Sequence, residues 1–200
     1  MATVEFFFDC SSPWTYLGYS RIRPVCAAAG AIIVWKPILV GGIFNTVNPG
    51  VYAQRDNPNP LKAAYARKDM ADWARYCGIR IRGIPPVFPV RAVTAMRGAL
   101  YALDQGCLEA YADAVFERYW GDFEDISQAS VLTAICRQVG LDSGDFFAAC
   151  DDLEIKARLR ANTDEVIARG GFGSPTIFVD GDDMYFGNDR IPLVEAALAR

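Results

Sequence analysis

A predicted strand is followed by a predicted helix near the start of the chain, and polar residues that could take part in a reaction lie at the corner between them. The run Val4–Phe8 is short and apolar, the turn Asp9–Ser12 is polar, and Pro13 begins a helical pattern. A serine directly before a proline favours a helix start, because its hydroxyl can accept from free N–H groups and proline suits the first helical position. The positive end of such a helix stabilises an anion, for example a thiolate. Ser12 is therefore the first candidate for chemistry.

The rest of the composition removes several alternative chemistries. The chain has no histidine, which excludes Ser–His and Cys–His nucleophilic centres and histidine zinc sites, so no metal site is predicted. Its six cysteines include no Cys-x-x-Cys pair, and thiols scattered in this way are expected to be mostly small buried groups. Cys10 stands beside the proposed site, where both a reactive and a buried thiol remain open.

A second polar cluster lies near the C-terminus, at Ser174-Pro175 and Gly187-Asn188-Asp189. Asp189 has two interpretations. It either caps the final helix or pairs with an ammonium group, while the helix N-terminus beside it receives a carboxylate. Asn188 is either a turn residue or part of the same binding site.

The string F-x-F-D-x-x-S-P-W-x-Y-L at residues 6–17 resembles the kappa-class glutathione transferases and their bacterial relatives, the 2-hydroxychromene-2-carboxylate isomerases. The resemblance spans essentially the whole chain and is densest at 5–18 and 171–190. Thioredoxin-fold oxidoreductases carry Cys-x-x-Cys at this corner. Here the tetrad is Ser12-Pro13-Trp14-Thr15, which has no thiol to attack or resolve, so dithiol exchange at this corner is excluded.

The resemblance implies an α/β, thioredoxin-like fold with a large all-helical insertion, as in DsbA. Residues 1–60 and 153–200 would form the thioredoxin-like domain, and residues 61–152 the helical insertion. Local patterns predict a loop over Val40–Pro60, either a functional lid or a plain surface excursion, and an extended segment over Ile84–Pro89. The strands expected are Val4–Phe8, Ile32–Pro37, Thr176–Val179 and Met184–Phe186.

Helices are predicted from apolar spacing and from glycine stops. The helix over Leu61–Cys77 should bury Tyr65, Met70 and Trp73. The other predicted helices are Trp14–Ala29 with a kink at Pro24, one that includes Val93, Met96, Leu100 and Leu103, and Leu108–Trp120, Ser127–Val139, Asp142–Cys150, Leu153–Arg169 and Ile191–Arg200.

Glutathione is the cofactor that the resemblance implies. Its thiol would lie at Ser12, whose hydroxyl would favour the thiolate. A cis bond at Ser174-Pro175 would present the backbone of Ser174 to the extended peptide. The γ-glutamyl end would lie against the segment at the start of the last helix, which consists of Phe186, Gly187, Asn188 and Asp189.

Candidate substrate residues are spread over three segments. Trp14, Phe44 and Tyr52 would line an aromatic pocket, although core packing explains them equally well. Asn45 stands about where the resembling family often has a lysine, and Asn48 is a similar candidate. Arg91, at a helix entry, either binds a substrate carboxylate or is simply exposed.

The function that the resemblance implies is a glutathione-dependent cis–trans isomerase of the 2-hydroxychromene-2-carboxylate type, active in aromatic catabolism. It would act by reversible addition of the Ser12-stabilised thiolate to a conjugated aromatic keto-acid. The alternatives are a kappa-type glutathione transferase or peroxidase, which consumes glutathione, and a non-catalytic thioredoxin-like binding protein.

Charge and hydropathy limit the classes of partner that the chain is expected to bind. The net charge is −4 and no run of Lys or Arg occurs, so a nucleic-acid partner is not expected. No apolar stretch approaches the ~20 residues of a membrane span, and no signal peptide is recognised, so a cytoplasmic protein is expected. The resembling family implies a homodimer.

Overall fold

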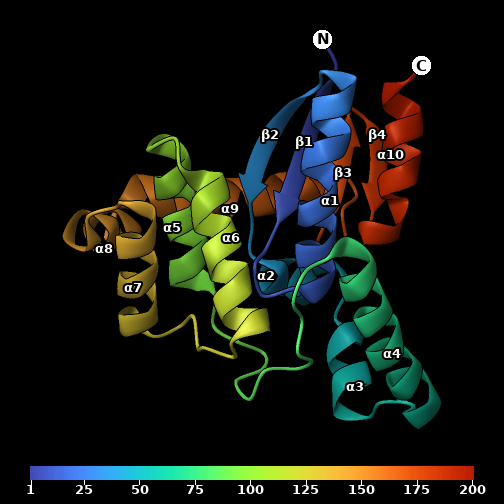
Figure 1. The fold of residues 1–200 in the computed structure, drawn as a ribbon, viewed down its shortest axis with the longest axis horizontal. Helices are drawn as coiled ribbons and strands as arrows, with labels where there is room; N and C mark the ends of the chain where they lie inside the picture. The colour runs from blue at the N-terminus through green and yellow to red at the C-terminus, as the bar shows by residue number, and fades with distance from the viewer.

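The centre of the structure is one mixed sheet with the strand order β2-β1-β3-β4 (Figure 1). The structure is a computed structural model and describes all residues 1–200. β1 (Thr3–Phe8) pairs in parallel with β2 (Ile32–Pro37) and antiparallel with β3 (Thr176–Val179). β3 in turn pairs antiparallel with β4 (Asp183–Phe186). The N-terminal and C-terminal parts of the chain thus share one sheet.

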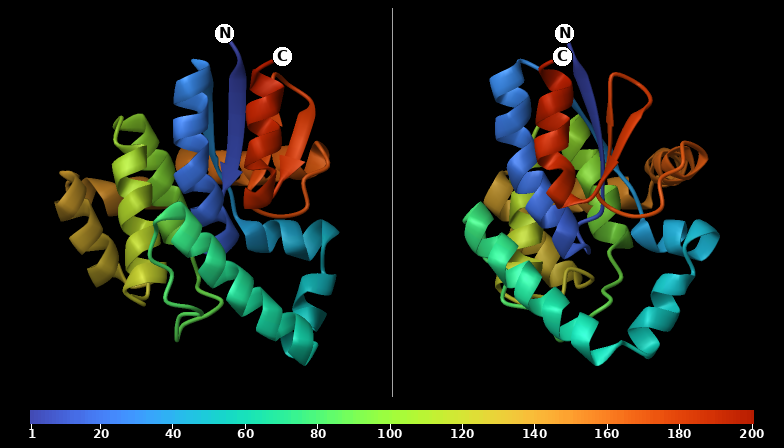
Figure 2. Two further views of the ribbon diagram at one scale, coloured as in Figure 1. Left: turned by 45° about the vertical axis from the view of Figure 1, so that its right-hand side comes forward. Right: turned by 90° about the vertical axis from the view of Figure 1, so that its right-hand side faces the viewer.

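The three consecutive phenylalanines of β1 bury both faces of that sheet, because successive side chains of a strand point to opposite sides. Phe6 and Phe8 belong to the larger core, together with Tyr19 of α1 (Pro13–Ala29) and Val194 of α10 (Ile191–Leu198). Phe7 faces the other way. It packs with Phe178 and with Val166 of α9 (Leu153–Ala168). Each fully buried phenylalanine stabilises the fold by about 1.5–3 kcal/mol. Helices therefore cover both faces (Figure 2).

The first helix begins and ends as its sequence predicts. Ser12 is the N-cap, and its side chain accepts from the N–H of Thr15, while Gly30 ends the helix in the left-handed conformation. The helix continues through Pro24 to Ala29.

The segment between β2 and β3 contains helices and connections but no strand. Its remaining members are α2 (Val40–Val47), α3 (Gly50–Asp56), α4 (Pro60–Cys77), α5 (Val93–Asp104), α6 (Leu108–Phe116), α7 (Ala129–Val139) and α8 (Ser143–Asp151). We propose that residues 61–152 form the inserted helical domain.

The predicted loop over Val40–Pro60 is wrong, because this segment contains α2 and α3. Distant residues stabilise α2. Asp9 accepts from the N–H of Val40 at 2.8 Å, which caps the helix from outside. Ile43 is buried against Val166 and Phe178. A segment rich in glycine and asparagine is therefore helical because of tertiary contacts.

Two helix predictions in the insertion also need correction. Tyr65 is 65% exposed rather than buried, and Trp73 is only half-buried. The buried residues of α4 are Met70 and Ala74, in its C-terminal half. The predicted helix Leu108–Trp120 stops being α-helical at Phe116 and continues as a π-helical turn over Glu117–Gly121.

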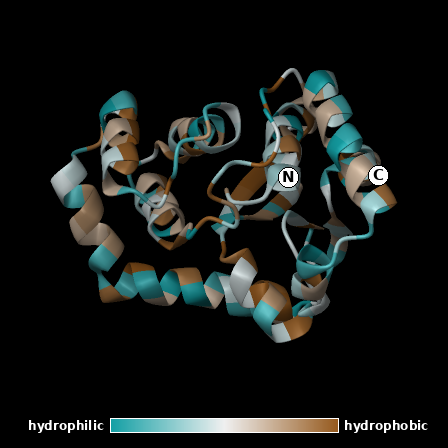
Figure 3. Cartoon of the chain, turned by 90° about the horizontal axis from the view of Figure 1, so that it is seen from below, coloured by the Kyte–Doolittle hydropathy of each residue, from teal (hydrophilic) through white to brown (hydrophobic).

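The helices carry hydrophilic and hydrophobic residues side by side (Figure 3). None of them combines the length and the apolar character that crossing a membrane requires.

Gly98 in α5 should tolerate no larger residue. A Cβ there would lie 2.3 Å from the Phe146 ring of α8 and 2.6 Å from the Tyr111 hydroxyl of α6. Overpacking of this kind costs about 1–3 kcal/mol, so Gly98→Ala should lower the free energy of unfolding by that amount. Urea denaturation measures it. Gly41→Ala in α2 is the control, since nothing lies within 4 Å of its Cβ position. Equal stability of the two variants would contradict the packing described.

Candidate active site

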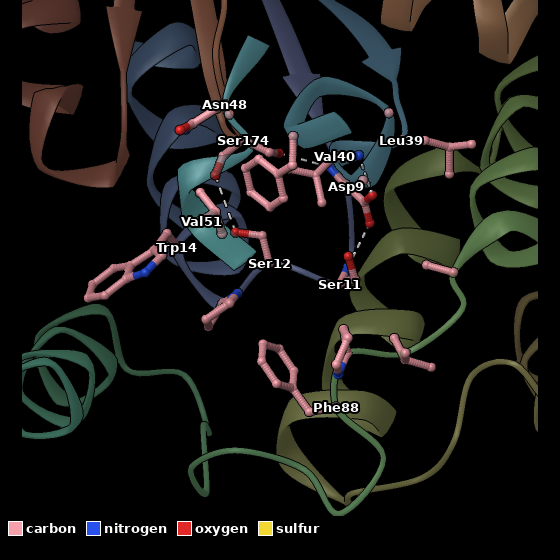
Figure 4. A pocket seen from close by; sticks show the side chains of 18 of the residues that line it. Asp9, Ser11, Ser12, Trp14, Leu39, Val40, Asn48, Val51, Phe88 and Ser174 are labelled. Carbon is pink, nitrogen blue, oxygen red and sulfur yellow. Dashed lines mark hydrogen bonds between the residues drawn. The ribbon is translucent and has the colours of Figure 1, made fainter. Parts of the chain in front are cut away.

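A cavity of about 710 Å³ opens at the carboxyl end of β1. The floor is the turn after β1 and the start of α1, and the lid consists of α2 and α3 (Figure 4). The segment before α5 and the segment before β3 complete the walls. Its lining is largely apolar, and Ser12, Asp9 and Ser174 are among its polar groups. A cavity of this size and character suits a small ligand with an apolar body.

The Ser12 hydroxyl lies at the N-terminus of α1 and lines the cavity. Its oxygen accepts from the N–H of Thr15 at 3.2 Å, and the hydroxyl donates to the carbonyl of Ser174 at 3.2 Å. The second bond is longer than the usual 2.7–2.8 Å or so for O–H···O, so it is a weak one. The hydroxyl proton can therefore turn toward a ligand at little cost.

The buried Ser174 side chain joins three backbone segments. Its oxygen accepts from the N–H of Asp9 at 3.0 Å and shares a hydrogen bond with the Thr15 hydroxyl at 2.7 Å. Thr15 is fully buried, so the fourth residue of the tetrad is structural. The bond between Ser174 and Pro175 is cis, as the resemblance implied. No group of the protein accepts from the Ser174 N–H.

Asp9 connects the floor of the cavity to the lid. Its two carboxylate oxygens accept from the N–H groups of Ser11 and Val40, each at 2.8 Å. Burial raises the pKa of this carboxyl from its ordinary 3.8, and the two hydrogen bonds oppose that rise. Because both oxygens are occupied by backbone donors, Asp9 orders the site rather than taking a proton from Ser12.

The structure brings many of the predicted site residues to the cavity. Those that line it are Ser12, Trp14, Phe44, Asn48, Tyr52, Arg91, Ser174 and Phe186. Asn48 donates to the carbonyl of Phe172, which links the lid to the segment before β3. Asn45 is outside the lining, and its amide oxygen accepts from the Tyr52 hydroxyl at 2.8 Å.

Pro175, Gly187, Asn188 and Asp189 lie outside the cavity lining. Gly187 is at φ 99°, a conformation that favours glycine, and a Cβ there would meet the Asp189 carboxylate at 2.8 Å. The N–H groups of Asn188 and Asp189 donate to no group of the protein. Asn188 is buried, and its amide nitrogen has no partner. This segment therefore has free donors.

Cys10 is fully buried, which decides between the two alternatives left open by the sequence. Burial and the nearby Asp9 and Asp113 carboxylates raise the pKa of its thiol well above the ordinary value. A reactive thiolate needs a lowered pKa, so Cys10 is a packing residue.

Several lining residues were not predicted as site residues from the sequence, among them Arg55, Phe88, Phe172 and Asp9. Asp9 had a signal, since it stands at the end of a buried strand. Arg55 and Phe172 had none, because an isolated arginine and an aromatic residue before Gly173 occur on many surfaces.

The raised pKa of Asp9 predicts a pH-dependent effect of Asp9→Asn. Between pH 3.8 and the higher folded-state pKa, the folded protein binds more protons at Asp9 than the unfolded chain. The stability of the wild type therefore falls through this window as the pH rises. Asp9→Asn has no proton to lose at this position. The difference in free energy of unfolding between the wild type and this variant should therefore narrow as the pH rises, which urea denaturation at a series of pH values measures.

Asp125→Asn is the control of opposite sign. A hydrogen bond from Ser127 lowers the pKa of Asp125 from 3.8, so its contribution disappears as the pH falls below that value. The difference in free energy of unfolding between the wild type and Asp125→Asn should therefore widen as the pH rises. Parallel pH profiles for the two variants would contradict the role given to Asp9.

Comparison with known proteins agrees with this architecture. The DsbA-like thioredoxin domain matches residues 3–199. The solved structure of a 2-hydroxychromene-2-carboxylate isomerase has a TM-score of 0.83 and 26% identity, covering 99% of this chain and 95% of that one. The predicted fold, thioredoxin-like with a helical insertion, is thereby confirmed.

Two relatives extend the comparison. A 2-hydroxychromene-2-carboxylate isomerase of Sphingobium xenophagum is 29% identical over 202 residues, covering 98% of this chain and 97% of its own length. Glutathione s-transferase kappa 2 of Caenorhabditis elegans is 30% identical over 213 residues, covering 98% and 91%. Both are named as enzymes, which supports the prediction of an enzyme. This chain belongs to the DsbA-like thioredoxin domain family.

Proposed function

We propose that this protein is a glutathione-dependent cis–trans isomerase of the 2-hydroxychromene-2-carboxylate type, acting on a small aromatic keto-acid. The observation that carries the proposal is the Ser12 hydroxyl, which lies at a helix N-terminus and opens onto a large, mostly apolar cavity. The relatives named as isomerases support the reaction class.

The residues present fit glutathione at two places: the backbone of Ser174, which lines the cavity, and the segment Gly187-Asn188-Asp189, which follows the lining residue Phe186. The Ser174 N–H is unused and its carbonyl holds only a weak bond, so this backbone can pair with an extended peptide. The free N–H groups of Asn188 and Asp189 suit a carboxylate, and the Asp189 carboxylate, which is exposed and paired only with Arg190, suits an ammonium group. These are the two groups of a γ-glutamyl end.

Bound glutathione would supply a thiolate that adds to a conjugated C=C bond and leaves again once the bond has rotated. Ser12 would favour the ionised thiol by turning its hydroxyl proton from the Ser174 carbonyl to the sulfur. The N–H of Thr15 keeps the Ser12 oxygen in place, and the positive end of α1 adds to the effect.

Ser12 is not itself a nucleophile in this proposal. A serine needs a neighbouring base, and the chain has no histidine. The nearby carboxylate, Asp9, is held by two backbone donors. Trp14, Phe44 and Tyr52 line the cavity and would pack against the aromatic ring of the substrate.

A kappa-type glutathione transferase is the second candidate, because the relative with 30% identity bears that name. The two reactions differ in what becomes of glutathione. An isomerase regenerates it and turns over with a catalytic amount, whereas a transferase consumes one equivalent for each product. Isomerisation of a hydroxybenzylidene pyruvate, followed by absorbance at catalytic and at stoichiometric glutathione, separates them.

Ser12→Ala should lower kcat by about 100-fold, the usual cost of losing one donor to a developing anion. Ser20→Ala in the same helix is the matched control, because its hydroxyl donates to the Leu17 carbonyl outside the cavity. Full activity of Ser12→Ala would contradict the role of Ser12.

Asp189→Ala should weaken glutathione binding in calorimetry, and an unchanged affinity would contradict the γ-glutamyl assignment.

A further inference from the structure

The charges of the cavity are unbalanced. Its charged lining residues are Asp9, Arg55 and Arg91. Asp9 is satisfied by backbone donors, as described above. Neither guanidinium group forms an ion pair, because every salt bridge of the structure involves other side chains. Neither donates a hydrogen bond to the protein, because the arginine side chains that do so are different ones. Two arginine side chains without an anionic partner therefore border a mostly apolar cavity.

Arg55 is held in place by aromatic rings. Its guanidinium carbon lies 5.5 Å from the ring centroid of Phe44, 5.4 Å from that of Phe88 and 6.0 Å from that of Tyr52. Phe44 belongs to α2, Tyr52 to α3 and Phe88 to the segment before α5. We call these three rings the aromatic cage. Cation–π attraction positions the guanidinium and uses none of its five N–H donors.

The cage matters because α3 has little else to hold it. No residue of α3 is buried. The contact of Arg55 with Phe88 links the lid to the wall of the cavity before α5. Tyr52 is anchored separately, through its hydroxyl, to Asn45 of α2. An anion that reaches Arg55 would therefore bind at the point where the lid meets the opposite wall.

We propose that Arg55 is the carboxylate-binding residue of this cavity and selects ligands that combine a carboxylate with an apolar or aromatic body. The guanidinium presents planar, paired donors that match a carboxylate, and the cage has already restricted its motion. Both arginines are exposed, but Arg91 has no aromatic contact of the kind that positions Arg55, so it is the weaker candidate. The assignment of the bound acid as substrate rests on the proposed function.

Two sources could supply the carboxylate: an aromatic acid, or the glycyl end of glutathione. The first source is tested without glutathione. We would titrate the protein with trans-cinnamate and with neutral cinnamamide by calorimetry, using wild type, Arg55→Gln, Arg55→Lys and the control Arg67→Gln. Arg67 lies on α4, outside the cavity, and its substitution removes the same charge.

Arg55→Gln should bind cinnamate about 10- to 100-fold more weakly, the usual cost of losing a charge-assisted hydrogen bond. Cinnamamide affinity should change little. Arg55→Lys keeps the charge without the paired donors, so its cinnamate affinity should lie between those of the wild type and Arg55→Gln. Arg67→Gln should match the wild type. Thermal unfolding of each variant identifies any loss of affinity that comes from misfolding, and Arg55→Lys then carries the comparison.

The second source is tested by titrating the same variants with glutathione and with glutathione monoethyl ester, in which the glycyl carboxylate is blocked. If Arg55→Gln weakens binding of glutathione but not of the ester, the carboxylate is the glycyl one. If it weakens binding of neither cinnamate nor glutathione, or if the wild type binds neither acid, the proposal for Arg55 is wrong. Arg55-dependent cinnamate binding without any glutathione binding would overturn the cofactor and leave the carboxylate site standing.

Discussion

The hydrogen bonds of Ser174 are the constraint on which the site depends. Its buried hydroxyl bonds both the N–H of Asp9, at the end of β1, and the hydroxyl of Thr15, in the first turn of α1. Its carbonyl accepts from Ser12. These bonds fix the start of α1 against the segment before β3, although the segments are more than 150 residues apart in the chain. A ligand group placed between Ser12 and Ser174 thus meets preformed donors, which reduces the cost of ordering the site.

The lid is attached more lightly than the floor. Asp9 joins the floor to the first N–H of α2, and Ile43 is buried beneath that helix. Beyond α2, the chain buries no residue until Met70 in α4. Segments with few buried contacts open at low free energy, as segments that admit ligands must do. The structure therefore combines a rigid hydroxyl corner with an aromatic lid whose contacts a ligand can complete.

Local sequence was sufficient for the corner and insufficient for the lid. The apolar run of β1, Ser12-Pro13 and Gly30 each mark the end of an element through residues next to it in sequence, so short-range rules located β1 and α1. The helix α2 depends on Asp9 and Val166, which lie far away in sequence. No residue of α3 is buried, so its pattern gave no helical signal either. The glycine and asparagine residues of this segment favoured a loop prediction instead. Arg55 has Gln54 and Asp56 as neighbours and resembles any solvated charge until folding brings Phe44 and Phe88 around it. Ser174-Pro175 was identified only because the chain resembles a family.

The central claim is that the Ser12 corner favours a thiolate over a thiol. The most direct measurement is the ultraviolet absorbance of the thiolate of bound glutathione as a function of pH, in the wild type and in Ser12→Ala. The account predicts that the wild type lowers the pKa of the bound thiol below the value of about 8.5 typical of a free thiol, and that Ser12→Ala returns it toward that value. A bound thiol that titrates like free glutathione, or equally in both proteins, would contradict the account.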